Sequence, residues 1–422
     1  MELKKLLYIS LFALTLSSCD KSDGETPSDN NPNATISLDT ETLELFRGED
    51  AHVQATLSGI DGTIVWSSSD ESVATVDQSG QISAVDKGFA TITASFGDIN
   101  TSLDLNVMPN TYVAGYMDND NEIARAAFWK NGTPVFLTDG SQNSYGLSMF
   151  VDGNDEYVVG SEFNGSYDVA MLWKNGEPHP LSDGSTSVYP SSIVVDNSIT
   201  YIAGTEFHGP YYIAKLWTNG VATDLSDGPF DSFANSVFLE RENIYVAGYE
   251  FNGAKYVAKL WKNGVEEDIT DGTNNATAKA VFVKDEDTYV VGDEFINGST
   301  IAMLWKNGVA HPLTDGAYYA TASSVFVKDT DVYVAGYEND GSKNVATIWK
   351  NGETIALPND SIQHTYGFSI FVDDSDVLVA GHTEPGGGEV NYMASLWKNG
   401  AFHPELQIEK TVNSGAYSVF VH

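Results

Sequence analysis

The chain has 422 residues, of which 59 are acidic and 21 are basic, so its formal net charge at pH 7 is −38. This negative charge repels nucleic acid and anionic lipid headgroups, and we therefore expect no nucleic-acid partner. The single cysteine, Cys19, excludes an intramolecular disulfide and a thiolate metal cluster. The charge suits solubility in a salty extracellular medium, and it also suits attraction of cations or a basic partner.

Residues 1–18 have the pattern of an export signal peptide. A short charged start precedes an apolar run, residues 6–16, which is too short to span a membrane as a helix. At the end of this run the segment Leu16-Ser17-Ser18-Cys19 resembles the lipobox of bacterial lipoproteins. The resemblance implies cleavage before Cys19, acylation of that cysteine and attachment to a membrane through the acyl chains. The alternative is an ordinary secreted protein with a stray cysteine.

Residues 19–33 contain no large apolar side chain and are typical of an acidic, flexible tether. An acidic stretch after the cysteine resembles the surface-export signals of Bacteroidota lipoproteins. Asp20 is a choice that favours inner-membrane retention in enterobacteria, so the final membrane depends on the organism. We expect a lipid-anchored protein of the cell envelope, at the outer membrane and exposed at the cell surface.

Residues 34–109 have the short, alternating apolar runs of a separate β-rich module. Four linked motifs follow in order at residues 65–70, 73–77, 80–85 and 88–94. Together they resemble a group 2 bacterial Ig-like domain, with Trp66 as the core aromatic residue. The resemblance implies a β-sandwich that acts as a stalk; adhesins also contain such domains. No residue within it is a site candidate.

Residues 110–422 contain a repeat marked by seven tryptophans, which are spaced by 44 residues five times and then by 48. Six of them begin Trp-Lys-Asn-Gly, and Trp217 begins Trp-Thr-Asn-Gly. Each repeat holds four short β-like runs, and the Asn-Gly pair suits a tight hairpin turn. A period in the forties with this content predicts a seven-bladed β-propeller. A solenoid or β-helix is the alternative.

The phase of the repeat predicts how the ring closes. The array begins at Tyr112 with a run of the second-strand type and ends at residues 418–421 with a run of the first-strand type. The C-terminal strand is therefore expected to complete blade one, which removes the free edge. The predicted fold class is all-β: an Ig-like sandwich followed by a propeller that its C-terminal strand closes.

Aromatic residues recur in the loops expected to enter the innermost strands, where they would ring the mouth of the axial channel. These residues are Tyr145, Tyr189, Phe233, Tyr318, Tyr319 and Tyr366. Aromatic side chains near Asn, Ser and Thr can stack on a sugar ring or hold a peptide. The alternative is that they fill space as packing residues.

Acidic residues form two further patterns. Asp118, Asp120 and Glu122 alternate in one loop of blade one and offer the hard oxygen ligands that calcium prefers, although the helix-flanked calcium-loop signature is absent. A solvated loop is the alternative. A glutamate recurs just after five second strands, where it lies at the ligand-binding rim or stabilises a turn; these are Glu162, Glu206, Glu250, Glu294 and Glu338.

No HExxH, GxSxG, P-loop or dinucleotide motif is present in the sequence. We therefore predict a non-catalytic binding or adhesion module with a glycan or protein ligand and no cofactor, calcium being the one candidate ion. Two alternatives stay open. One is a polysaccharide-active enzyme that uses Asp118, Asp120 or His382 for acid–base chemistry, and the other is an architectural component of the envelope.

Overall fold

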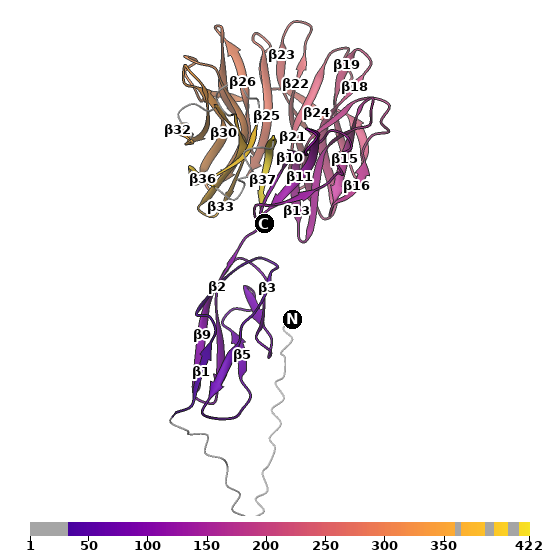
Figure 1. Ribbon diagram of the computed structural model, residues 1–422. Helices are drawn as coiled ribbons and strands as arrows, with labels where there is room; N and C mark the ends of the chain where they lie inside the picture. Colours follow the sequence, from indigo (N-terminus) through magenta and orange to yellow (C-terminus); the bar gives the residue numbers. More distant parts are fainter. Residues whose placement is uncertain (1–32, 359–363, 385–391, 404–412) are drawn as a thin grey trace, which may run out of the picture. The chain divides into compact units, whose positions relative to one another are not determined.

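A computed structural model of the protein describes residues 33–358, 364–384, 392–403 and 413–422, which form β-strands and no helix (Figure 1). The chain divides into two compact units, and the boundary falls between Met108 and Pro109. A membrane-crossing helix, judged by length and apolar character, is not found in the described part of the chain. The predicted signal peptide, Cys19 and all of the predicted tether except Asn33 lie outside the described residues.

The first unit is a sandwich of a four-stranded and a three-stranded sheet, with a two-stranded pair beside them. The strand order β2-β9-β8-β5 comprises Thr42–Phe46, Ile99–Met108, Gly88–Phe96 and Val65–Ser68; the order β3-β7-β6 comprises Asp50–His52, Gln81–Ala84 and Ala74–Val76; and the pair β1-β4 comprises Thr35–Leu38 and Ala55–Ser58. Alternate residues of these strands form the core, including Trp66, Ile82 and Leu103. The predicted role of Trp66 as the core aromatic residue is therefore confirmed.

The second unit consists of seven four-stranded antiparallel sheets. From the innermost strand outward, blades two to four are β13–β16 (Ser144–Asp152, Asp155–Phe163, Asp168–Lys174, Glu177–Pro180), β17–β20 (Val188–Asp196, Ile199–His208, Tyr211–Thr218, Val221–Asp224) and β21–β24 (Ser232–Glu240, Asn243–Phe251, Tyr256–Lys262, Val265–Asp268). Blades five to seven are β25–β28 (Ala276–Lys284, Asp287–Ile296, Ser299–Lys306, Val309–Pro312), β29–β32 (Ala320–Lys328, Asp331–Asn339, Asn344–Lys350, Glu353–Ala356) and β33–β36 (His364–Asp373, Asp376–Glu384, Met393–Lys398, Ala401–His403).

Blade one is assembled from the two ends of this unit, as the phase of the repeat predicts. Its order is β37-β10-β11-β12, comprising Ser414–Val421, Thr111–Asp118, Ala124–Lys130 and Thr133–Phe136. β37 runs antiparallel to β10 from Thr111 opposite Val421 to Met117 opposite Ser414, and it lies beside β10 in Figure 1. The second unit is therefore a seven-bladed propeller whose last strand completes its first blade.

The repeated tryptophan lies on the third strand of each blade and is the largest buried side chain there. All seven are at most 1 % exposed, which agrees with the large area that an aromatic residue buries between sheets. The Asn-Gly turns follow directly: Asn175 has a φ of 51° and Gly176 a φ of 80°. Both values lie in the left-handed region that such turns require.

Two rings of side chains join the innermost strands to one another around the axis. Serine hydroxyls accept hydrogen bonds of 3.1–3.4 Å from a backbone N–H of the next blade at six of the seven junctions. The seventh position is Ala280. Two residues further along, six of the seven strands have a phenyl ring and blade three has Val194. Centroids of neighbouring rings are 4.6–5.2 Å apart; these residues are Phe150, Phe238, Phe282, Phe326, Phe371 and Phe420.

Candidate functional site

A β-bulge recurs at one register of every innermost strand. Each bulge leaves one residue unpaired against the second strand; these seven are Leu147, Ser191, Asn235, Lys279, Ser323, Phe368 and Tyr417. A glycine of the second strand lies opposite each bulge, and a Cβ on Gly160 would lie 1.8 Å from the carbonyl oxygen of Tyr145. The repeated glycine is therefore required by the close approach of the bulged backbone.

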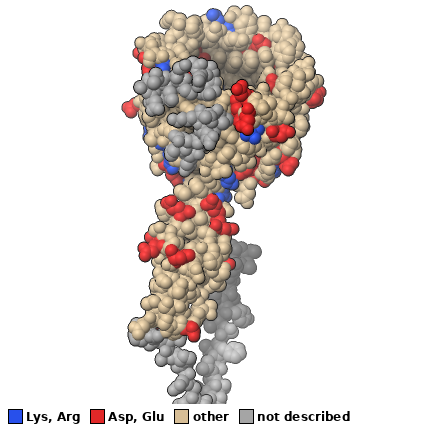
Figure 2. All heavy atoms as spheres, viewed as in Figure 1, with Lys and Arg blue, Asp and Glu red and all other residues tan. Residues whose placement is uncertain are grey.

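The bulge residues circle the end of the axial channel at which the second-to-third-strand loops emerge, and we call this end the mouth. The surface of the propeller is hollowed at the top of Figure 2, where these loops lie. Four bulge residues, from blades one to four, line a pocket of about 380 Å³. That volume falls within the range of small-molecule sites, roughly 300–1,000 Å³.

The pocket wall is mainly aromatic and apolar. It is formed by Leu147, Tyr189, Pro190, Ser191, Thr205, Tyr212, Phe233, Ala234, Asn235 and Tyr417. Phe233 stacks between Tyr212 and Tyr249, with ring centroids 5.3 and 4.7 Å away. Tyr189 is 37 % exposed, and its hydroxyl donates to Asp168 Oδ2 at 3.0 Å. The wall therefore presents aromatic faces whose orientations are held by neighbouring side chains.

On blades six, seven and one the aromatic side chains pack against one another. Tyr366 contacts Tyr337 and His382 with ring centroids 4.9 and 4.8 Å apart, and its hydroxyl donates to Glu384 Oε2 at 3.3 Å. Burial raises the pKa of the Tyr366 hydroxyl to about 12 and lowers the pKa of His382 to about 4. His382 is therefore a neutral member of an aromatic cluster at pH 7.

The structure separates the aromatic residues that the sequence grouped. Tyr189 and Phe233 line the pocket, whereas Tyr145 packs edge-on against Tyr116, whose ring stacks on Tyr417. Four of them, Tyr145, Tyr189, Phe233 and Tyr366, lie within innermost strands and not in loops, because these strands begin several residues earlier than their apolar runs suggest.

The two remaining aromatic candidates precede β29 and lie away from the pocket. Tyr318 is 49 % exposed and its hydroxyl lies against Gly341, in the second-to-third-strand loop of blade six. The Tyr319 hydroxyl donates to Asn344 Oδ1 at 2.5 Å. Neither residue lines the pocket, because Tyr318 contacts the blade-six loop and Tyr319 bonds to the first residue of β31.

Sequence reasoning missed Leu147, Tyr212, Asn235 and Tyr417, which line the pocket, and Lys279 beside it. The available signal was variation within the repeat: the position before the innermost Ser or Ala holds seven residues of six different types. That position is the bulge, and an irregular pairing has no signature in a period-two pattern of apolar residues.

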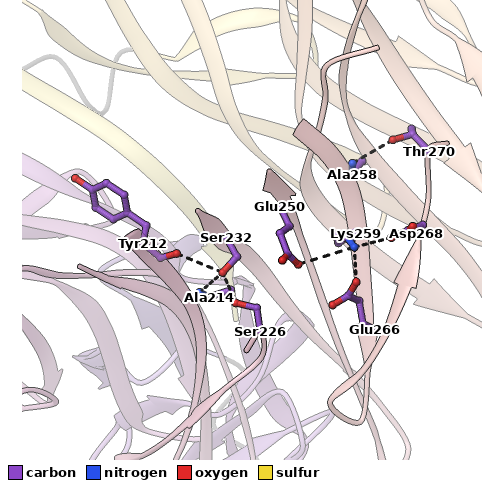
Figure 3. Close-up of polar contacts among 10 residues, drawn as sticks. All are labelled: Tyr212, Ala214, Ser226, Ser232, Glu250, Ala258, Lys259, Glu266, Asp268 and Thr270. Carbon is purple, nitrogen blue, oxygen red and sulfur yellow. Dashed lines mark hydrogen bonds and ion pairs between the residues drawn. The ribbon is translucent and has the colours of Figure 1, made fainter. Parts of the chain in front are cut away.

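The recurring glutamates take part in packing at the blade rims. Figure 3 shows Lys259 beside Glu250, Glu266 and Asp268, with Nζ 2.6 Å from Asp268 Oδ1 and 3.9 Å from Glu250 Oε2. Burial alone would lower the pKa of Lys259, but hydrogen bonds to Asp268 and Glu266 outweigh it and raise the pKa. Lys215 pairs in the same way with Glu206, at 2.6 Å.

These lysine partners account for two of the three acids around a second pocket, of about 500 Å³, at the outer edge of blades three and four. It is lined in part by Asp224, Asp227 and Glu266. Asp224 Oδ1 lies 2.7 Å from Lys215 Nζ, and Glu266 pairs with Lys259. Asp224 and Glu266 therefore neutralise largely buried ammonium groups at this edge.

The acidic loop of blade one does not gather its carboxylates. Asp118 Oδ2 accepts a hydrogen bond from Asn413 Nδ2 at 3.1 Å, and burial raises the pKa of this carboxyl group. Asp120 and Glu122 are exposed, and the turn is organised by Asn119, whose Oδ1 accepts from two backbone N–H groups. Across the described residues no group of three or more His, Cys, Asp or Glu side chains is arranged to hold a metal. Calcium binding stays a prediction.

A family model matches the N-terminal part of the chain. Residues 25–107 match the bacterial Ig-like domain (group 2), which confirms the resemblance inferred from the motifs. This match lies within the first unit. Comparison with curated protein sequences finds no significant match.

Several solved structures are similar in fold at low sequence identity. TolB from Acinetobacter baumannii is 8 % identical with a TM-score of 0.42, over 76 % of this chain and 94 % of that chain. Trypanosoma rangeli sialidase in complex with sialic acid is 9 % identical with a TM-score of 0.41, over 71 % and 58 %. Kuenenia stuttgartiensis hydrazine synthase is 10 % identical with a TM-score of 0.40, over 73 % and 46 %. This chain spans less than two thirds of the length of the sialidase and of the hydrazine synthase.

Proposed function

We propose that this protein is an exported, lipid-anchored protein of the cell envelope that binds a glycan or protein ligand in the mouth pocket and catalyses no reaction. The observation that carries the proposal is the aromatic wall formed by Tyr189, Tyr212 and Phe233 around a pocket of about 380 Å³. The match of residues 25–107 to a bacterial Ig-like domain supports the envelope location, because such domains are typical of bacterial surface proteins. The lipobox resemblance at Cys19 supports the anchor.

Rigidity of the wall favours binding. Because Phe233 is already stacked between two tyrosines, its side chain loses little freedom when a ligand contacts it. Exposed aromatic faces contribute a large apolar contact area together with polar edges. The same wall suits the flat faces of sugar rings and the side chains of a peptide.

The acid–base candidates support a binding role over a catalytic one. Asp118 is tied to Asn413, and its carboxyl group is partly buried. His382 lies among Tyr366, Phe368 and Tyr392, with ring centroids 4.6–4.9 Å away. A general base must reach the proton that it removes, and these contacts enclose His382 in packing.

The test is an array of glycans and envelope proteins probed with the purified full-length protein in detergent, with and without calcium. We expect one or more ligands to bind, and we expect the double variant Tyr189→Ala/Phe233→Ala to lose them. The matched control is Tyr318→Ala, which removes an exposed tyrosine outside the pocket and should leave binding unchanged. If every ligand binds the double variant as well as the wild type, the proposal is wrong. Co-purification with one fixed complex, without soluble ligand binding, would instead support the architectural alternative.

A further inference from the structure

Blade five interrupts the aromatic mouth with a charged cluster. At the position after the second-strand glycine, the other six blades have Tyr116, Ser161, Thr205, Tyr249, Tyr337 and His382, whereas blade five has Asp293. Its bulge residue, Lys279, is the only charged one of the seven, and Lys279 Nζ lies 2.6 Å from Asp293 Oδ2. Both departures from the repeat thus occur on one blade and contact each other.

Two threonines complete this cluster. Thr277 Oγ1 donates to Asp293 Oδ1 at 2.9 Å, and Thr321 Oγ1 donates to Asp293 Oδ2 at 2.5 Å. Lys279 Nζ also donates to Thr321 Oγ1. An ammonium has three N–H donors and a carboxylate has about four acceptor positions. Asp293 and Thr321 engage two of the donors, and the three neighbours engage three of the acceptor positions. The cluster can therefore offer one further donor and one further acceptor.

The cluster adjoins the pocket wall. Asn235 lines the pocket, and its Nδ2 donates at 2.8 Å to the carbonyl oxygen of Ala278, the residue before Lys279. The side chain of Lys279 is 35 % exposed and that of Asp293 is 16 % exposed. A ligand that extends from the aromatic wall across Asn235 therefore reaches a half-buried pair with no net charge.

The chemistry of a matching ligand follows from these features. A donor beside an acceptor fits a hydroxyl group, which is both, and the stacked rings fit an apolar face of a cyclic compound. An anionic ligand is opposed by the net charge of −38, and Lys279 offers it no uncompensated positive charge because Asp293 neutralises the ammonium group. Neutral saccharides combine hydroxyl groups with apolar ring faces and carry no charge.

We propose that the mouth selects neutral oligosaccharides, with one sugar ring packed against Tyr189 and the exposed edge of Phe233 and the hydroxyl groups of a neighbouring sugar bound by Lys279 and Asp293. This inference rests on the proposed binding function and narrows its ligand to one chemical class. Because the binding pair is internally neutralised, affinity should change little with salt concentration.

The experiment is calorimetric titration of the full-length protein in detergent with two sets of probes. One set contains neutral gluco-, manno- and xylo-oligosaccharides, and the other contains uronic-acid and sulfated oligosaccharides of similar length. We expect neutral probes to bind and Lys279→Met to weaken them about tenfold or more, which is the size of a lost hydrogen bond to a charged group. The matched control is Lys284→Met on the same strand, whose Nζ donates to the carbonyl oxygen of Asp329; it should leave binding unchanged.

Thermal unfolding of each variant separates loss of binding from loss of fold. If Lys279→Met unfolds early, Lys279→Met/Asp293→Leu, which leaves no unpaired charge, gives the same test. The proposal is overturned if charged probes bind more tightly, if no neutral probe binds, or if the folded Lys279 variants bind neutral probes like the wild type. A protein ligand lost by Tyr189→Ala/Phe233→Ala, without any saccharide binding, would overturn this inference and leave the proposed function standing. Both would fail if neither pair of residues affects any ligand.

Discussion

The two sides of the mouth use the same residue types differently. On blades six, seven and one, Tyr366, His382 and Tyr116 contact other rings and are largely covered. On blades three and four, Tyr189 and Phe233 lie at matching registers but border an open pocket. Neighbouring side chains therefore decide whether an aromatic residue becomes core or site, and we call these two regions the packed side and the open side.

The largest expected effect comes from deleting residues 413–422, which removes β37 from both sides at once. Tyr417 on this strand stacks on Tyr116 and also lines the pocket. We expect the propeller to lose its cooperative unfolding transition, because β10 becomes a free edge and buried residues such as Val419 are lost. Tryptophan fluorescence during heating measures this.

The control for the deletion is Tyr417→Ala, which keeps the strand and removes one ring. It should retain one sharp transition while weakening ligand binding. A deleted chain that still unfolds in a single transition close to that of the full chain would show that the ring does not depend on its last strand.

The next effect distinguishes the two sides directly. Tyr116 on the packed side is 6 % exposed, and Tyr116→Ala is expected to lower the free energy of unfolding by about 3 kcal/mol. Tyr189 on the open side is 37 % exposed, and Tyr189→Ala should cost less than about 1 kcal/mol while reducing ligand binding. Urea unfolding of both variants measures the difference, and equal losses would contradict the distinction between packing and site.

A pH effect is expected from the packed side. Burial lowers the pKa of His382 to about 4, so between about pH 4 and pH 6.5 the unfolded chain binds a proton that the folded chain does not. The stabilising contribution of His382 is complete above the unfolded pKa of about 6.5 and is lost as the pH falls toward the folded value. The total loss is about 3 kcal/mol, since the pKa differs by about 2.5 units and each unit corresponds to about 1.4 kcal/mol.

The control for this effect is His382→Phe, which cannot be protonated. The unfolding free energies of both proteins are measured in urea at pH 7 and at pH 4.5. We expect the wild type to lose more stability than the variant between these two pH values. A difference that stays constant over this range would mean that the His382 ring is not kept neutral by its surroundings.

The smallest expected effect concerns the serine hydroxyl groups that bridge neighbouring innermost strands on both sides of the mouth. Ala280 on blade five takes the position at which six other innermost strands place a bridging hydroxyl group. Ala280→Ser should form a hydrogen bond to the backbone N–H of Val325 and raise the unfolding free energy by about 0.5–1 kcal/mol. Ser236→Ala, which removes the bond from Val281 N–H, should lower it by a similar amount. A destabilised Ala280→Ser variant would show that this junction has no room for the hydroxyl group.

Much of the fold follows from repeated local signals. Each Asn-Gly turn, each third-strand tryptophan and each second-strand glycine acts within one blade, so its meaning can be understood from the repeat alone. Ring closure was predictable because the first and last runs are of different strand types, and only antiparallel pairing of β37 with β10 completes a four-stranded sheet. The Ig-like unit was predictable from motifs that alternate with period two.

The site followed from the sequence only in part. Tyr189 and Phe233 were identified because aromatic residues recur before the innermost apolar runs, yet Tyr366 at the same register is a packing residue, and Tyr318 lies elsewhere. The bulge that brings Leu147, Asn235 and Lys279 to the mouth is an irregularity of pairing, and hydrophobic periodicity does not encode it.

Strand types, their order, the number of blades and the closing strand are thus properties of the sequence, because backbone pairing and side-chain alternation act over a few residues at a time. Exposure at the mouth is a property of the tertiary structure. Tyr116 and Tyr417 meet across three hundred residues of sequence, and Asp293 gains Thr321 from the next blade. Only closure of the ring brings these side chains within contact distance, and those contacts decide which aromatic faces remain free to bind.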